Sequence, residues 1–126
     1  ADIRCEMDAI HLCSNAKEKK PFQLVTQPYP GFPTDLQSLF LCLATQLKGQ
    51  STIIETLFEN RFQIVNELKK MGALIEINSN IAQITGETIL RGARVRATDL
   101  RSGAALVCAA LAAEGESQVL NAQLIL

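Results

Sequence analysis

Three segments of the chain carry apolar residues at the spacing of an α-helix, and a glycine follows each segment. The apolar side of the first segment consists of Leu36, Leu39, Phe40, Leu43 and Leu47. Because an aspartate can cap a helix and a glycine readily ends one, the pattern predicts a helix over residues 35–49. The same signals predict helices over residues 60–71 and 99–115.

Strands are predicted between these helices, where β-branched or alternating runs occur. Residues 51–55 form a short β-branched run, and 93–97 alternate between small apolar residues and arginine. Ile75 and Ile77 alternate with polar residues, and the pattern continues at 81–84 after a turn at 78–80. A further strand is predicted at 117–120, and the final run 119–126 is interpreted as a continuous apolar strand.

The order of these elements contains an internal repeat. Thr34-Asp35-Leu36 opens the first helix and Thr98-Asp99-Leu100 opens the third, and residues 1–3 correspond to 73–75. We interpret the chain as two copies of a strand–strand–helix–strand unit, over about 1–72 and 73–126, linked by the helix at 60–71. Such a repeat predicts an α/β architecture in which helices pack on sheets.

Composition narrows the function classes. The 126 residues fit one domain, and 12 Lys+Arg against 13 Asp+Glu argue against broad nucleic-acid binding. Apolar stretches are too short to cross a membrane, no secretory signal is visible, and both ends of the sequence suggest a piece of a longer protein. The four cysteines form no Cys-x-x-Cys pair, so we expect reduced thiols, a cytoplasmic protein and no metal site.

Candidate chemistry lies at the predicted helix starts. Asp35 follows the proline-rich stretch 25–34, and Asp99 stands two residues before Arg101. Either aspartate could be an ordinary helix cap, or its carboxylate could serve a reaction. Arg61 stands in the predicted first turn of the middle helix, where free backbone N–H groups favour anions.

Three segments resemble a known family. PYPGFPTDLQ at 28–37, ETLFENRF at 55–62 and ATDLR at 97–101 closely resemble the UDP-N-acetylglucosamine 1-carboxyvinyltransferases, in order and with the family's spacing. The resemblance implies a fold of two inside-out α/β barrel domains with three strand–helix repeats each. This chain would supply two repeats of one domain, a partial catalytic domain. The shikimate-pathway enolpyruvyl transferase shares the fold but not these motifs.

The resemblance also implies the chemistry. Family members transfer the enolpyruvyl group of phosphoenolpyruvate to the 3-hydroxyl of UDP-N-acetylglucosamine, the first committed step of peptidoglycan synthesis, without a cofactor. Asp35 matches the aspartate proposed to take the hydroxyl proton, and Leu57 matches a position that contacts the UDP-sugar. Arg61, Asp99 and Arg101 match polar residues that border the cleft. The expected partners are these two substrates and the remainder of the full-length enzyme, with no nucleic acid and no membrane.

Some family features have no match here. The Lys-Asn pair and the loop with the catalytic cysteine are not found in this chain, and Ile64 stands where the family usually has histidine. We therefore expect the chain alone to be inactive. The alternative reading is a catalytically silent binding or structural module that retains the fold.

Overall fold

The computed structural model describes residues 2–13 and 19–125. The strands within these ranges are β1 Asp2–Cys5, β2 Ile10–Cys13, β3 Gln23–Val25, β4 Gly49–Ile54, β5 Leu74–Asn78, β6 Ile81–Gly86, β7 Arg94–Arg96 and β8 Gln118–Leu120. The α-helices are α1 Gln37–Thr45, α2 Ile64–Lys70 and α3 Leu100–Ala112, and two short 3-10 helices are η1 Thr34–Leu36 and η2 Ala122–Leu124. In the described part of the chain, no helix has the length and apolarity needed to span a membrane.

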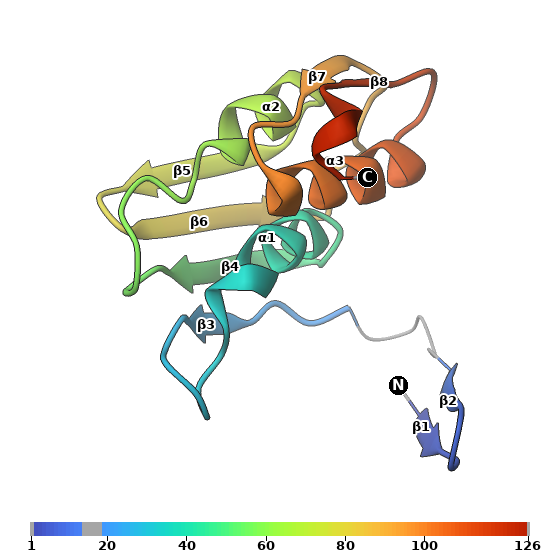
Figure 1. Cartoon of the computed structure of the whole chain (residues 1–126). Coiled ribbons are helices and arrows are strands. Elements are labelled where there is room, and N and C mark those ends of the chain that lie inside the picture. Colours follow the sequence, from blue (N-terminus) through green and yellow to red (C-terminus); the bar gives the residue numbers. More distant parts are fainter. Residues whose placement is uncertain (1, 14–18, 126) are drawn as a thin grey trace.

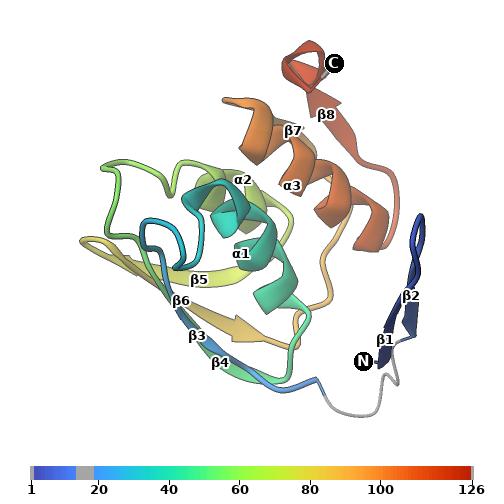
Figure 2. The ribbon, with the colours of Figure 1, turned by 60° about the horizontal axis from the view of Figure 1, so that its bottom comes forward.

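A four-stranded mixed sheet forms the centre of the molecule, in the order β3-β4-β6-β5. β3 and β4 are parallel and are connected through α1, whereas β6 pairs antiparallel with both β4 and β5. Helices α1 and α2 lie on one face of this sheet, and α3 packs across them on the side away from it (Figures 1 and 2). The predicted α/β architecture with helices packed on a sheet is therefore confirmed.

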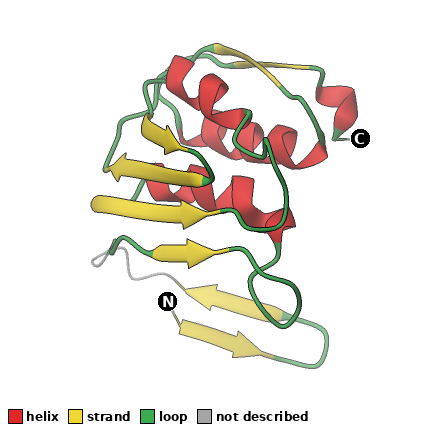
Figure 3. Cartoon of the chain, turned by 90° about the vertical axis from the view of Figure 1, so that its left-hand side faces the viewer, coloured by secondary structure: helices red, strands yellow, loops and turns green. Residues whose placement is uncertain are grey.

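The internal repeat of the sequence appears as a repeat of topology. An antiparallel hairpin, β1–β2 or β5–β6, precedes a strand, a helix and a parallel strand, β3–α1–β4 or β7–α3–β8. Three strands thus precede the helix in each unit, where the sequence pattern suggested two. The central sheet takes two strands from each unit (Figure 3), and the β1–β2 hairpin forms a separate sheet that stands apart from it (Figures 1 and 2).

The core lies between the sheet and the three helices, and it also receives side chains from β7 and the loops. Its fully buried large side chains are Leu41, Ile53, Ile64, Leu68, Met71, Ile84, Leu90, Val95 and Leu106. Each such side chain stabilises the fold by roughly 1.5–3 kcal/mol relative to an exposed position. Ile75 is buried as predicted, but Ile77 is 41% exposed near the β5–β6 turn.

Several element ends differ from the predictions. The helix predicted over 35–49 comprises only Gln37–Thr45, with η1 ahead of it and a turn behind it. The helix predicted from residue 60 begins at Ile64, because Asn60 has a φ of 57°, outside the right-handed helical region. The final apolar run is not one strand, since Asn121 turns left-handed and η2 follows β8.

Candidate functional site

The proline-rich loop after β3 is held in a compact turn. Thr26 N donates to Ile54 O at 2.9 Å, and Gln27 N donates to Phe32 O at 2.9 Å, which closes the loop. At Gly31 an added Cβ would lie 2.4 Å from Gln27 Cβ, so the close approach requires a glycine. The Phe32 ring packs edge-on against an aromatic ring of α1. These contacts fix where the chain enters η1, and so where Asp35 lies.

Asp35 is not a helix cap. It lies inside η1, whose N-cap is Pro33, and the N-cap of α1 is Leu36, with no side-chain capping bond at either position. The predicted capping role is therefore wrong, because the 3-10 turn moves the helix start two residues downstream. Instead the Asp35 carboxylate accepts a hydrogen bond from Arg101 Nε at 2.5 Å. Asp35 remains 67% exposed in this ion pair.

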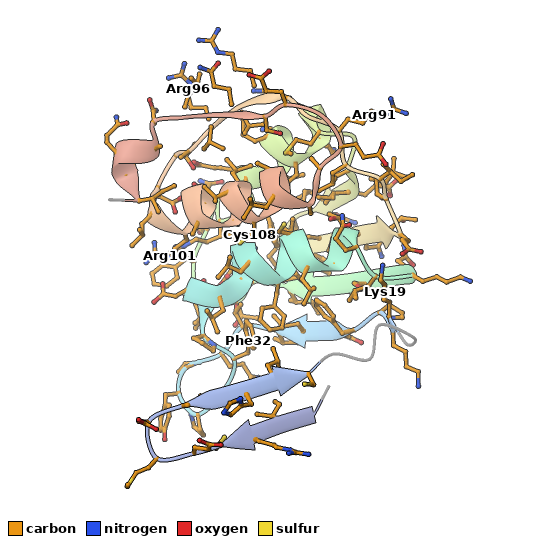
Figure 4. The ribbon with its side chains drawn as sticks, turned by 90° about the vertical axis from the view of Figure 1, so that its right-hand side faces the viewer. Lys19, Phe32, Arg91, Arg96, Arg101 and Cys108 are labelled. Carbon is orange, nitrogen blue, oxygen red and sulfur yellow. The ribbon has the colours of Figure 1, made fainter. Side chains whose placement is uncertain are left out.

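Asp99, at the matching position of the second unit, does cap its helix. Its carboxylate accepts from Arg101 N at 2.8 Å and from Ser102 N at 3.0 Å, and Ser102 Oγ accepts in return from Asp99 N at 3.0 Å. This capping box places Arg101 in the first turn of α3, beside the start of α1 (Figure 4). Asp99 thus holds the backbone at Arg101, and Asp35 forms an ion pair with the Arg101 guanidinium.

A loop after β4 carries the other two candidate residues. Leu57 and Arg61 both line a cavity of about 820 Å³, which is formed by residues 55–63 together with Ile77 and residues 79–80 near the β5–β6 turn. The Arg61 guanidinium lies over the Phe58 ring, 4.4 Å from its centroid. Arg61 precedes α2 and is not in its first turn, so the predicted placement beside free helical N–H groups is wrong.

A second, smaller cavity of about 190 Å³ shares several lining residues with the larger one. Arg61 lines it as well, together with Asp99 and Arg101 from the start of α3 and Thr34 from η1. Ile64 also lines this cavity and presents a hydrocarbon chain that cannot carry a proton. Leu57, Arg61, Asp99 and Arg101 line these two cavities, and Asp35 is attached to them through its ion pair with Arg101. The structure thus brings together residues that the sequence spreads over 67 positions (35–101).

Sequence reasoning missed Glu55, a carboxylate of 3% exposure at the end of β4. It accepts hydrogen bonds from the hydroxyls of Thr26 and Thr34 and from the backbone N–H groups of Leu57 and Phe58. Burial by itself raises the pKa of this carboxyl, but these hydrogen bonds, that of Thr34 foremost, lower the pKa below its ordinary value. The only signal in the sequence was a glutamate at the end of a β-branched run.

A metal is not indicated by side-chain clustering. Within residues 2–13 and 19–125, no group of three or more His, Cys, Asp or Glu side chains could hold an ion. The arrangement that the structure does contain is an exposed carboxylate, two arginines and two cavities. Such a set can bind an anionic ligand and accept a proton from a hydroxyl group.

Comparison with known proteins assigns the class. The sequence profile of the family described as EPSP synthase (3-phosphoshikimate 1-carboxyvinyltransferase) matches residues 1–125, and the chain belongs to this family. The enolpyruvyl transferase NikO from Streptomyces tendae has the same fold, with a TM-score of 0.89 and 25% identity over 98% of this chain and 29% of that one. An EPSP synthase structure from Acinetobacter baumannii matches with a TM-score of 0.59 and 22% identity, over 68% of this chain and 21% of that one. This second match supports the fold alone.

Within the family, this chain is most clearly similar to proteins of one name. UDP-N-acetylglucosamine 1-carboxyvinyltransferase 1 of Legionella pneumophila (strain Lens) is 59% identical over 94% of this chain and 24% of the relative. The enzyme of that name from Helicobacter pylori (strain ATCC 700392 / 26695) is 54% identical over 82% of this chain and 25% of the relative. The resemblance seen in the motifs is therefore confirmed. The chain spans about a quarter of the length of these two relatives.

Proposed function

We propose that the protein containing this chain transfers the enolpyruvyl group of phosphoenolpyruvate to the 3-hydroxyl of UDP-N-acetylglucosamine. The single observation that carries the proposal is the Asp35–Arg101 ion pair, which joins the helix starts of the two repeat units in a family of enolpyruvyl transferases. Relatives at 54–59% identity bear the name of this activity. No observation favours the silent binding or structural module.

Asp35 is the proposed proton acceptor. A sugar hydroxyl is a weak nucleophile, so its oxygen needs a carboxylate within hydrogen-bond reach when it adds to C2 of phosphoenolpyruvate. The methylene carbon gains a proton in this addition, which produces a tetrahedral intermediate. Loss of phosphate from C2 and of one methyl proton then forms the enolpyruvyl ether. Asp35 suits the first proton transfer because it is exposed and its position is held by Arg101.

Arg101 and Arg61 both line the smaller cavity and supply positive charge to it. Guanidinium groups bind phosphate and carboxylate oxygens through paired N–H donors, and such fixed donors stabilise charge that develops on a reacting group. Leu57 lines the larger cavity, and we assign this cavity to the UDP-sugar. Asp99 acts on the site through the backbone of Arg101, and its carboxylate also lines the smaller cavity.

We infer that this chain provides two strand–helix repeats of a partial catalytic domain, over about 1–72 and 73–126, and that the remainder of a full-length enzyme completes the site. We place the reaction in the cytoplasm and in peptidoglycan synthesis. The family resemblance supports both placements, and the free thiols of the four cysteines support the cytoplasm.

The test is Asp35→Asn in the complete enzyme, obtained by replacing the matched segment of the Legionella pneumophila relative with this chain. Asparagine keeps the shape and can still accept a hydrogen bond from Arg101, but it cannot take up the hydroxyl proton. Loss of a general base typically costs about 10²–10⁴-fold in rate, so we expect a fall in turnover of this size with an unchanged melting temperature.

Glu87→Gln is the matched control. Glu87 is also an exposed acid in an ion pair, with Lys19 at 2.6 Å, but it lies after β6 and away from both cavities. Its replacement is expected to leave turnover within two-fold of the parent. If Asp35→Asn retains turnover within a few-fold of the parent, Asp35 is not the proton acceptor. If the parent enzyme itself transfers no enolpyruvyl group, the proposed function is wrong.

A further inference from the structure

Three loops that surround the candidate site meet at one residue, Glu55. Its carboxylate Oε2 accepts from Thr34 Oγ1 at 2.7 Å, and Oε1 accepts from Thr26 Oγ1 at 2.8 Å, so both ends of the proline-rich loop are bound to it. Oε1 also accepts from Leu57 N at 2.9 Å and from Phe58 N at 3.3 Å. The side chain therefore joins the loop that carries Asp35 to the loop that carries Leu57.

The backbone of Glu55 reaches the third loop. Glu55 N donates to Asn80 O at 2.9 Å, and Asn80 Nδ2 donates to Glu55 O at 2.9 Å, so the β5–β6 turn is attached at the same point. Thr26 adds further links, because its hydroxyl accepts from Thr56 N at 2.9 Å and its carbonyl accepts from Thr56 Oγ1. Both walls of the larger cavity, residues 55–63 and 79–80, are thereby tied to the loop that leads into η1.

The hydrogen bonds of Glu55 satisfy a buried charge and at the same time couple two loops of the site. A buried carboxylate is costly unless its lone pairs are satisfied, and two threonine hydroxyls and two backbone N–H groups satisfy these. Thr34 precedes Asp35 directly, and Leu57 N donates to the same carboxylate, so one side chain sets the distance between two residues of the proposed site. A misplacement of about 1 Å at a reacting group can cost about 10²-fold in rate.

We propose that Glu55 is a positioning residue, which sets Asp35 relative to the Leu57 wall of the sugar-nucleotide cavity through its hydrogen bonds to Thr34 and Leu57. Glu55 need not touch substrate. The inference rests on the proposed function for its kinetic consequence, but the coupling of the two loops is a property of the folded chain itself. It can therefore be measured with and without turnover.

The experiment cuts one link at a time in the complete enzyme. Thr34→Val removes the hydroxyl that donates to Glu55 but leaves the hydrogen bonds from Thr26 and Leu57 in place. The buried carboxylate therefore still has hydrogen-bond donors from the protein. We expect turnover to fall about ten-fold or more, while the KM for UDP-N-acetylglucosamine changes by less than two-fold, because the Leu57 side remains held. Thr34→Ser restores the hydroxyl and is expected to restore turnover.

Thr88→Val is the matched control, since Thr88 is also a half-buried threonine whose hydroxyl donates one hydrogen bond, to Thr85 O at 3.0 Å. It is expected to leave turnover unchanged. Glu55→Asp keeps the charge but shortens the side chain, so it cannot reach both loops and should behave like Thr34→Val.

Hydrogen exchange provides the readout that does not depend on catalysis. In Thr34→Val, the hydrogen-bonded backbone amides of Gly31 and Leu36 are expected to exchange at least three-fold faster than in the parent, whereas in Thr34→Ser and Thr88→Val they exchange at the parental rate. If the parent is inactive but exchange changes in this way, the proposed function is wrong and the loop coupling holds. If Thr34→Val leaves both exchange and turnover at the parental level, Glu55 does not position Asp35.

Discussion

Replacement of Asp99 by alanine removes one half of the capping box at the start of α3. In the parent, the Asp99 carboxylate accepts from Arg101 N at 2.8 Å and from Ser102 N at 3.0 Å. Alanine leaves these two N–H groups without a side-chain acceptor, and Ser102 is buried at 3% exposure, so water replaces the lost bond poorly there. The remaining half of the box, from Asp99 N to Ser102 Oγ, uses the backbone and survives the substitution.

The expected loss follows from these two bonds. Removal of an aspartate cap costs about 1 kcal/mol, within a range of about 0.5–2 kcal/mol, and the partly buried setting favours the upper half of that range. For a chain of 126 residues, the entropy of unfolding gives a fall in melting temperature of about 4 °C for each kcal/mol. With a slope of about 2 kcal/mol/M, the urea midpoint should fall by about 0.5 M or more. Far-UV circular dichroism follows both transitions.

Asp35→Ala is the control, because Asp35 occupies the same position of the Thr-Asp-Leu sequence but accepts no backbone hydrogen bond. It breaks only an exposed ion pair, and such pairs contribute little to stability. We expect its urea midpoint to fall by less than a third of the change in Asp99→Ala. Equal losses in the two variants would show that the cap geometry does not decide stability, and would refute the reasoning.

Four further outcomes are expected. The isolated chain should release no phosphate from phosphoenolpyruvate and UDP-N-acetylglucosamine, since several family catalytic groups lie outside it, and substrate-dependent release above a blank would contradict this. Thiol titration should detect Cys5, Cys13 and Cys108 in the native chain, but Cys42 only after unfolding. Burial, and to a smaller extent the nearby Cys108, raises the pKa of Cys42 to about 12, so its thiol is unreactive in the folded state. Rapid titration of all four thiols in the native chain would contradict this prediction. Gly92→Ala should lower stability by about 1–3 kcal/mol in urea unfolding, because its Cβ would lie 2.1 Å from Glu116 O, and an unchanged midpoint would be inconsistent with this contact. The pKa of Glu55 lies below the ordinary value of 4.5, so its ionised carboxylate stabilises the fold at pH values above 4.5, and this stability is lost as the pH falls through the lowered pKa. The urea midpoint of the parent should therefore fall more steeply in acid than that of Glu55→Gln. Parallel slopes for the two proteins would count against this reasoning.

Local signals in the sequence were sufficient for the elements that depend on near neighbours. The apolar spacing identified α1, α2 and α3. Asp99 was also correctly predicted to cap a helix, because the N–H groups that it binds lie two and three residues away. Gly72 follows the C-cap of α2 with a positive φ, which a glycine adopts without strain. Gly49 and Gly115 also have a positive φ, but they lie beyond the helix ends at Thr45 and Ala112, and Gly49 is the first residue of β4. The three motifs also identified the enolpyruvyl transferase fold, which the family profile and the NikO structure confirm.

The same Thr-Asp-Leu signal failed at 34–36, and the reason lies outside that segment. The proline-rich loop is closed against β4 and packs Phe32 onto α1, and this packing places the chain in a 3-10 turn before the helix can begin. Asp35 then faces Arg101, which is 66 residues away along the chain. No local pattern distinguishes the aspartate that caps from the one that forms the ion pair.

The role of Glu55 was likewise decided by tertiary structure alone. Periodicity and capping report contacts over a few residues, because they follow from the geometry of a single helix or strand. Glu55 binds hydroxyls that are 21 and 29 residues distant, and these reach it only because β3 pairs in parallel with β4 after α1 has crossed over. The sequence by itself determined where α1, α2, α3 and the strands β4 to β8 form, whereas the pairing of the strands decided which polar side chains share a site.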